Sequence, residues 1–268
     1  MGRKGSGAKR GREEGSAAAS TRSFTSPSIV PPETAGGKSV TATLSPSFLY
    51  KDIIFTVGDP FLTPRECSRW IEWGEVQGFE RTQLTATRYN AHRDNGRISV
   101  HSPEVAAAIF ERLKHFMPAL GDRQPVCASP NIRLYKYCVG QSFGKHVDQS
   151  SRDDSTGAIS EWTVLMYLNG GGKGTLTLTL LTCLCSLSRF ALAYPLPSLI
   201  YALDEGDELA GGETIFYRGS YGGKVAVSFT PKKGAVLLHG HGERCLTHEG
   251  AMVTAGVKYL LRTDICYR

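Results

Sequence analysis

The sequence lacks the cysteine pairs that mark a zinc-binding or disulfide-stabilised protein. Its seven cysteines are an odd number, and none of them forms a CxxC motif; Cys183 and Cys185 are separated by a single residue. Structural zinc sites and disulfide frameworks both need several cysteines at close, paired spacing. The pattern argues against both kinds of site and indicates a reducing compartment.

A secretory signal and a strong charge bias in the main part of the chain are also missing. The N-terminal residues MGRKGSGAKRGR are not followed by the apolar stretch that a signal peptide requires. Seven basic and three acidic residues precede Phe48, so this segment supplies +4 of the formal net charge of +6. Because the rest of the chain is nearly neutral, we expect no nucleic-acid partner. A basic cluster can act as a nuclear address, and we expect a cytoplasmic or nuclear protein.

The composition indicates a globular domain behind a tail. Apolar residues make up 41% of the chain and charged residues 21%, which are globular values, and the 30 glycines show no collagen-like repeat. Residues 1–47 are rich in Gly, Ser, Ala and basic residues without apolar periodicity, which predicts a disordered basic tail. Residues 48–268 are predicted to form one folded domain.

An atypical apolar insertion is predicted at about residues 174–205. Its Thr- and Leu-rich segment has one charge, Arg189, and is long enough to span a bilayer. Strands are predicted on both sides of it, and a single span would place them on opposite sides of the membrane. We therefore expect no stable membrane span, and interpret the segment as a surface insertion or as a sequence artefact.

Two helices and a series of short strands are predicted in the domain. Residues 63–66 (TPRE) indicate a capping box with proline at the first helical position, and residues 102–104 (SPE) open a second helix. From Asn131 the apolar period changes to two, which is typical of strands. Strands are predicted at 131–137, 163–168, 214–217, 224–229, 235–239 and 257–267. Loops rather than helices separate them, which predicts a mostly β fold with flanking helices, an antiparallel sandwich or jelly roll.

The strongest chemical signal is the pair His146 and Asp148 in the segment YCVGQSFGKHVD. Side chains two residues apart on an extended backbone point to the same side. One more histidine would complete a facial triad, which holds Fe(II) and leaves three coordination positions open. From the residues alone, His239, His241 and His248 all remain candidates, and a His–Asp pair is also a common surface feature.

Three sequence segments, occurring one after another along the chain, together resemble one known family more specifically than any single motif does. YxxGQxxxxHxD, GGETxF and HxxxxxxxxxKxxxR resemble the prolyl 4-hydroxylase-like branch of the 2-oxoglutarate- and Fe(II)-dependent dioxygenases. The segments RDNGRISV and NIRLYKY are also similar to this branch, particularly to plant members without a secretory segment. The resemblance covers residues 48–268 apart from the insertion.

The resemblance implies a double-stranded β-helix, a form of jelly roll, preceded by helical support elements. It implies that a set of three residues binds iron: His146, Asp148 and His248. It implies that Lys258 pairs with the distal carboxylate of 2-oxoglutarate and that Tyr137 and Thr214 donate hydroxyls to it. The implied activity is hydroxylation of a protein or peptide substrate at a prolyl residue, with release of succinate and CO2 and with ascorbate as a further cofactor.

Several alternatives stay open. Arg262 lies four residues beyond Lys258 on the same strand face and is a rival anchor for the carboxylate. The chain could be a catalytically inactive binding module with the same fold, or an oxygenase acting on a nucleobase, a lipid or a free amino acid. Arg93 and Arg97, which flank Asn95, are predicted in a loop that either lines the substrate entrance or is simply solvated.

Overall fold

The computed structural model describes residues 26–27, 44–58, 60–87, 90–154, 157–171, 209–219 and 223–268. Most of the predicted tail and all of the predicted insertion lie outside these residues. Within the described part, no helix is both long and apolar enough to cross a membrane.

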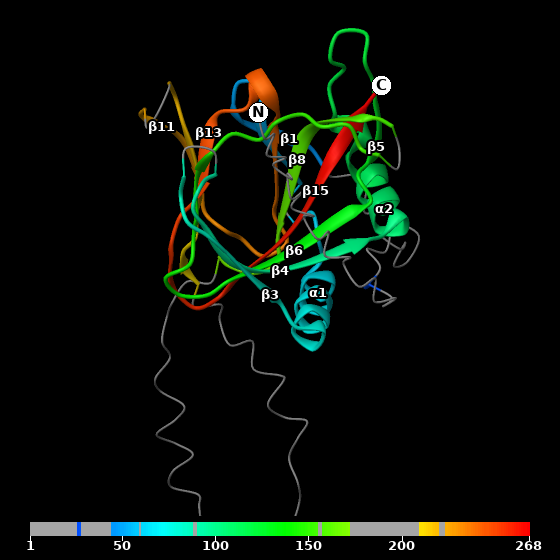
Figure 1. The fold of residues 1–268 in the computed structure, drawn as a ribbon. Coiled ribbons are helices and arrows are strands. Elements are labelled where there is room, and N and C mark those ends of the chain that lie inside the picture. The colour runs from blue at the N-terminus through cyan, green and yellow to red at the C-terminus, as the bar shows by residue number, and fades with distance from the viewer. Residues whose placement is uncertain are drawn as a thin grey trace, which may run out of the picture.

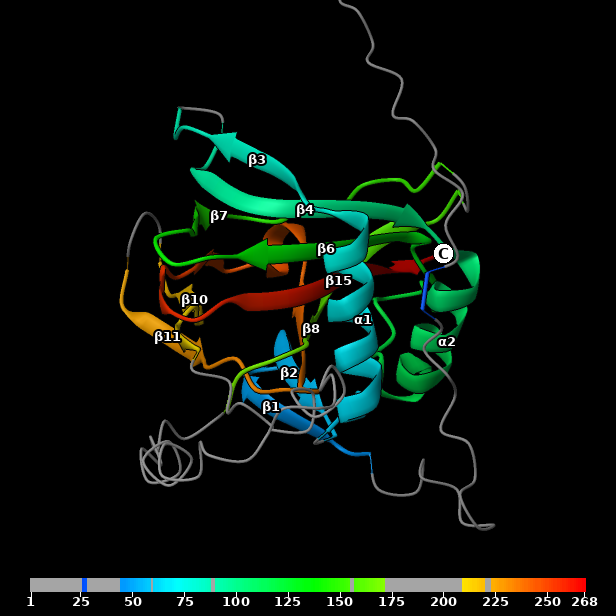
Figure 2. The same ribbon diagram turned by 90° about the horizontal axis from the view of Figure 1, so that it is seen from below.

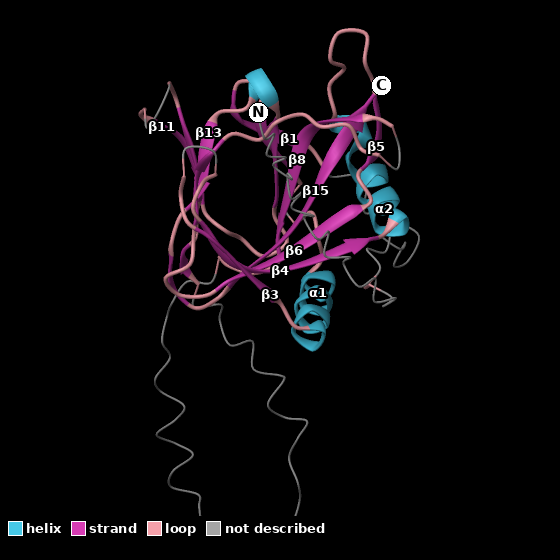
Figure 3. Cartoon of the chain, in the orientation of Figure 1, coloured by secondary structure: helices cyan, strands magenta, loops and turns pink. Residues whose placement is uncertain are grey.

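The fold is a double-stranded β-helix built almost entirely from one curled antiparallel sheet (Figures 1 and 3). Thirteen strands form this sheet, with the order β1-β2-β12-β8-β15-β6-β4-β7-β13-β10-β11, β3 added to β4 and β5 added to β15. A separate pair joins β14 to β9. The strands are β1 (Pro46–Tyr50), β2 (Ile54–Val57), β3 (Glu80–Leu84), β4 (Arg93–His101), β5 (Pro125–Ala128), β6 (Asn131–Tyr137), β7 (Phe143–His146), β8 (Ile159–Tyr167), β9 (Ala210–Gly211), β10 (Thr214–Tyr217), β11 (Val225–Phe229), β12 (Val236–Gly240), β13 (Thr247–Gly250), β14 (Val253–Ala255) and β15 (Lys258–Tyr267). The predicted jelly roll is therefore confirmed.

Two helices support the sheet from outside (Figure 2). Helix α1 (Pro64–Gln77) has the predicted capping box: the Thr63 side chain accepts from the Glu66 backbone N–H, and the Glu66 side chain accepts from the Thr63 backbone N–H. Helix α2 (Pro103–Leu113) is capped by Ser102 and is followed by the 3-10 turn η2 (Lys114–Phe116). A second 3-10 turn, η4 (Gly242–Arg244), follows β12. Both predicted helices are confirmed.

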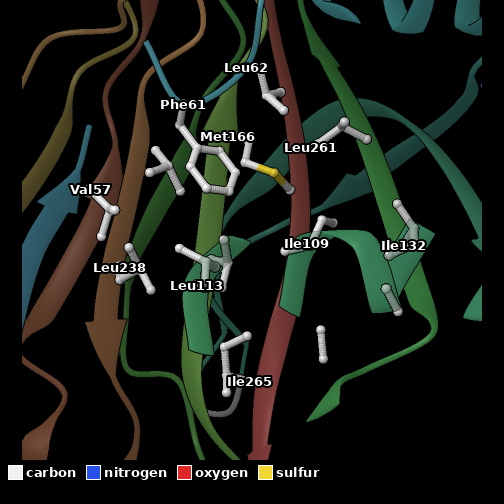
Figure 4. Close-up of a cluster of buried hydrophobic side chains, with 14 of the residues drawn as sticks. Val57, Phe61, Leu62, Ile109, Leu113, Ile132, Met166, Leu238, Leu261 and Ile265 are labelled. Atoms are coloured by element: carbon white, nitrogen blue, oxygen red, sulfur yellow. The ribbon is translucent and has the colours of Figure 1, made fainter. Parts of the chain in front are cut away.

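The main hydrophobic core lies between the helices and the outer face of the sheet (Figure 4). Ile109 and Leu113 of α2 meet Ile132 of β6 and Leu261 of β15, all of them fully buried. Gly74 of α1 permits this close packing, since a Cβ there would lie 2.5 Å from a methyl group of Leu134. Gly74 lies inside α1, and Gly78 forms its C-cap.

A second apolar cluster fills the inside of the curled sheet, and includes Tyr135, Tyr167, Phe216 and Leu260. Because side chains alternate along a strand, β15 sends Leu261 to the helices and Leu260 to the interior. The same face also carries polar side chains, among them Thr214, His248 and Lys258, which line a cavity.

The prediction that Arg93 and Arg97 lie in a loop is wrong. Both belong to β4, which pairs with β3 on one side and β6 on the other. The segment is polar and contains Gly96, so it shows no apolar alternation. Its strand conformation is instead imposed by the two neighbouring strands, which satisfy its backbone groups.

Candidate functional site

The inside of the curled sheet holds a cavity with polar and apolar lining residues. It is lined by side chains from β6, β7, β8, β10, β12, β13 and β15. Seven residues singled out in the sequence all reach it: Tyr137, His146, Asp148, Thr214, His248, Lys258 and Arg262. Residues up to 125 positions apart are brought together only because the sheet curls on itself.

At one end of the cavity, two histidines and a carboxylate converge. We call His146, Asp148 and His248 the metal-facing triad; one ligand atom from each lies within 4.8 Å of the others. His146 on β7 and His248 on β13 are directly opposite each other in the antiparallel ladder, and their ring centres are 4.2 Å apart. The Nε2 atom of His146 lies 3.7 Å from Asp148 Oδ1, and that of His248 lies 3.9 Å from Asp148 Oδ2.

Local hydrogen bonds orient both imidazoles. The Nδ1 atom of His146 is 2.8 Å from the Gly144 carbonyl, and that of His248 is 3.0 Å from the Leu246 carbonyl. A carbonyl only accepts, so each Nδ1 carries the proton and each Nε2 presents a lone pair to the cavity. Burial, and then the neighbouring His248, lower the pKa of His146 to about 3, which keeps this imidazole neutral at neutral pH.

Asp148 is held in place as an anion. Its Oδ2 accepts from Arg262 Nη2 at 2.9 Å and from the Thr163 hydroxyl at 2.7 Å. Burial alone would raise the pKa of this carboxyl group, but the charge of Arg262 and the surrounding histidines together hold it well below its usual range. With Oδ2 engaged, Oδ1 has no hydrogen-bond partner among the described residues, which favours binding of a metal through one oxygen.

The structure separates the three candidate histidines that the sequence left open. His241 is engaged elsewhere, because its Nδ1 lies 3.1 Å from the Ser160 carbonyl and its Nε2 lies 2.8 Å from the Thr163 hydroxyl. His239 is fully buried and its Nε2 lies 3.7 Å from Asp148 Oδ2, with no hydrogen-bond partner in the described structure. Of the three, His248 is the one that groups with His146 and Asp148.

Two neutral imidazoles and one carboxylate are the donor set that suits Fe(II) in non-haem oxygenases. The triad fits such an ion: its lone pairs face one point, and its carboxylate is ionised. A second group within 4.8 Å joins His239 and His248 to the Cys245 thiol. Burial raises the pKa of Cys245 to about 12, so this thiol is protonated at neutral pH in the metal-free protein.

At the other end of the cavity, Lys258 is a buried cation. It is 3% exposed, and its Nζ donates to the Gly212 carbonyl at 2.6 Å. The rings of Tyr137, directly opposite it on β6, and of Tyr167 lie about 5.5 Å from Nζ. No carboxylate of the described residues lies within 4.0 Å of this ammonium group, so a bound anion would supply the missing counter-charge. Burial lowers the pKa of Lys258 to about 8, against the charge of Glu213, which raises it.

Hydroxyl groups surround the Lys258 end. Thr214 on β10 lies 2.7 Å from the Tyr167 hydroxyl, oxygen to oxygen. Tyr137, 6% exposed, lines the same space. Arg262, in contrast, lies at the other end beside Asp148, so the two cations of β15 serve different ends of the cavity.

Some site residues were not identified from the sequence. Thr163 contacts Asp148 from β8, and Phe143 stacks on His146 with ring centres 3.7 Å apart. Phe143 lies in the same GQSFGKH segment, three residues before His146, and the stacking could not be read from that spacing. Thr163 is 15 residues beyond Asp148 and meets it only through the sheet topology.

Comparison with known proteins supports the fold. No family model and no curated protein matches the chain. Among solved structures, a prolyl hydroxylase from Trichoplax adhaerens, in complex with a hypoxia inducible factor oxygen degradation domain peptide fragment, is 15% identical, with a TM-score of 0.53, over 81% of this chain and 84% of that one. The 2OG complex of a viral collagen prolyl hydroxylase from Paramecium Bursaria Chlorella virus-1 is 17% identical over 77% and 92%, with a TM-score of 0.45. A prolyl-4-hydroxylase from Pseudomonas putida is 14% identical over 78% and 90%, with a TM-score of 0.43.

Proposed function

We propose that this chain is an Fe(II)- and 2-oxoglutarate-dependent dioxygenase that hydroxylates a peptide substrate at a prolyl residue. The single observation that carries the proposal is the shared cavity, with the metal-facing triad at one end and the buried Lys258 at the other. The fold, which the Trichoplax prolyl hydroxylase shares, agrees with this assignment.

The triad would hold the iron and leave coordination positions for a 2-oxo acid and O2. Bound iron supplies the oxygen-activating chemistry, in which one oxygen atom is transferred to the substrate and the other enters succinate as 2-oxoglutarate loses CO2. The His146 and His248 Nε2 lone pairs and Asp148 Oδ1 face the metal position. Arg262 and Thr163 keep Asp148 ionised and oriented.

Lys258 would receive the distal carboxylate of 2-oxoglutarate. The ammonium group lies among the Tyr137, Tyr167 and Thr214 hydroxyl-bearing side chains, which would satisfy the remaining lone pairs of a bound carboxylate. The cosubstrate would therefore be fixed at both ends, by the metal and by Lys258. The apolar Leu165 and Leu260 line the same cavity and would limit the entry of water.

A peptide substrate is supported by two considerations. The sequence segments around the site resemble the prolyl 4-hydroxylase-like branch, and the Trichoplax neighbour was solved with a peptide fragment. Ascorbate would serve, as the resemblance implies, to keep the iron reduced.

The experiment is a screen by mass spectrometry with purified protein, Fe(II), 2-oxoglutarate and a library of proline-containing peptides. We expect a gain of one oxygen that needs both iron and 2-oxoglutarate, with matching succinate. Succinate formation without modification of any peptide would point to a non-peptide substrate. The absence of any iron-dependent succinate would identify the chain as a binding module that keeps the fold without the activity.

A further inference from the structure

One face of β4 carries cations that the proposed function has not used. Arg93, Asn95 and Arg97 alternate along this strand and so project to one side. Arg97 is directly opposite Tyr135 on β6, and Arg93 is directly opposite Phe143 on β7. Tyr135 and Phe143 both line the cavity, and cross-strand partners share a face. The three β4 side chains therefore belong to the cavity side of the sheet, beside its lining.

Both arginines lack an acidic partner in the described part of the chain, where no carboxylate lies within 4.0 Å of either guanidinium. Among the described residues, Arg97 donates only to the Ser99 hydroxyl, at 3.1 Å. The Arg93 guanidinium lies over the Phe143 ring, 3.8 Å from its centre, and this ring in turn stacks on His146. Arg93 is thus separated from the metal-facing triad by one aromatic ring.

The two nearby acidic residues, Asp94 and Glu249, do not pair with Arg93 or Arg97. Asp94 projects to the opposite side, where it pairs with Arg81 at 3.1 Å and accepts from Gln141 at 3.0 Å. Glu249 lines the cavity from β13, and its carboxylate is hydrogen-bonded to the Tyr217 hydroxyl. Burial raises the pKa of the Tyr137 hydroxyl above its usual range, and the positive charges of Arg93 and Arg97 act on it in the opposite direction.

Asn95 adds an unused acceptor between the two cations. It is fully buried, its amide nitrogen donates to the Gly96 carbonyl at 3.2 Å, and its side-chain oxygen has no partner in the described structure. Buried polar atoms without partners are uncommon. A ligand that brings an N–H group to this face would satisfy it.

We infer that the β4 face formed by Arg93, Asn95 and Arg97 binds an acidic stretch of a peptide substrate and directs the residue next to it toward the metal-facing triad. The inference rests on the proposed function, because that function supplies the reason for a peptide to enter here. Two unpaired guanidiniums suit carboxylate side chains, and the orphaned acceptor suits a backbone N–H.

The test uses the full chain and three fluorescein-labelled peptides of equal length, each with a central proline flanked by Glu, by Gln or by Lys. Fluorescence anisotropy should show the Glu peptide binding about tenfold more tightly than the Gln peptide, and the Lys peptide most weakly. Arg93→Gln and Arg97→Gln should each weaken binding of the Glu peptide about three- to tenfold and leave the Gln peptide unchanged. Arg97→Lys should retain part of the affinity.

Arg81→Gln is the matched control, because it removes an arginine from the neighbouring strand but from the other face of the sheet. It should change binding of the Glu peptide by less than about twofold. Equal binding of Glu and Gln peptides, or an equal loss for Arg81→Gln and Arg97→Gln, would overturn the inference. So would tighter binding of a ten-nucleotide single-stranded DNA than of the Glu peptide.

The unmodified chain is assayed in parallel for iron-dependent succinate formation. If succinate forms but the chain shows no preference for acidic peptides, only the inference about the β4 face is overturned, and the proposed function stands. An arginine-dependent preference for the Glu peptide with no succinate under any condition would support this binding face and overturn the proposed oxygenase.

Discussion

Lys258→Ala is the substitution that tests the cosubstrate end of the site most directly. The wild-type ammonium group is 3% exposed, donates to the Gly212 carbonyl at 2.6 Å and has no carboxylate of the described residues within 4.0 Å. A bound 2-oxoglutarate would therefore depend on this one charge at its distal end. Removing one partner of a buried ion pair costs about 3–5 kcal/mol, which corresponds to about two to four decades in the dissociation constant.

The assay is calorimetric titration of 2-oxoglutarate into anaerobic, Fe(II)-loaded protein, with KM for 2-oxoglutarate measured in parallel. Iron content should remain near that of the unmodified chain, because Lys258 does not face the triad. Lys258→Arg should restore only part of the affinity, since the planar guanidinium does not fit a space shaped around an ammonium group.

Arg262→Ala is the matched comparison, because it removes the other cation from the same face of the same strand. Its guanidinium lies 2.9 Å from Asp148, so we expect weakened orientation of Asp148 and a smaller rise in the 2-oxoglutarate dissociation constant. A larger rise for Arg262→Ala than for Lys258→Ala would show that the anchor has been assigned to the wrong residue.

Four further outcomes are expected. Alanine at any member of the metal-facing triad should abolish stoichiometric iron binding measured by metal analysis, whereas His241→Ala should retain much of it; the reverse result would move the third ligand to His241. The 2-oxoglutarate dissociation constant should rise as the pH increases above about 8, by up to tenfold per pH unit, because the free protein then loses the Lys258 proton. In the ligand-free protein the same lowered pKa should make stability increase with pH between about 8 and 10.5, as chemical denaturation at several pH values would show; a flat profile, or one also seen with Lys258→Ala, would contradict this. Leu261→Ala, on the opposite face of β15, should reduce the free energy of unfolding by about 2–5 kcal/mol while the affinity for 2-oxoglutarate stays within about twofold; a large loss of affinity would mean that the two faces are not independent.

The sequence predicted most of the framework because local chemistry specifies it. The capping box at Thr63 and the alternation from Asn131 to Tyr137 both give the element found in the structure. Strand β4 was missed because its polar residues are held extended by β3 and β6 and not by a pattern of their own. Strand β8 begins at Ile159, four residues earlier than predicted, since the polar Ser160 and Glu161 interrupt the apolar run.

Some site residues could be predicted from local spacing, whereas others depend on how distant strands pair in the sheet. His146 and Asp148 are neighbours in the chain, so their convergence follows from spacing. The choice of His248 over His241 needed either the family resemblance or the pairing of β13 with β7, which places His248 opposite His146. The position of Arg262 beside Asp148 could not be predicted, because strand alternation fixes only the face and not the end of the cavity that a side chain reaches.

The place of β15 in the sheet has a consequence for how the chain folds during synthesis. It follows every other described strand in sequence, yet it lies between β8 and β6 and pairs with both. Until β15 leaves the ribosome, β1-β2-β12-β8 and β6-β4-β7-β13-β10-β11 form two separate groups with an unpaired strand edge on each. Such edges are prone to aggregation, and non-local pairing is slow. The nascent chain should therefore depend on chaperones until its last strand joins the two halves and, in the same step, delivers Lys258 and Arg262 to the cavity.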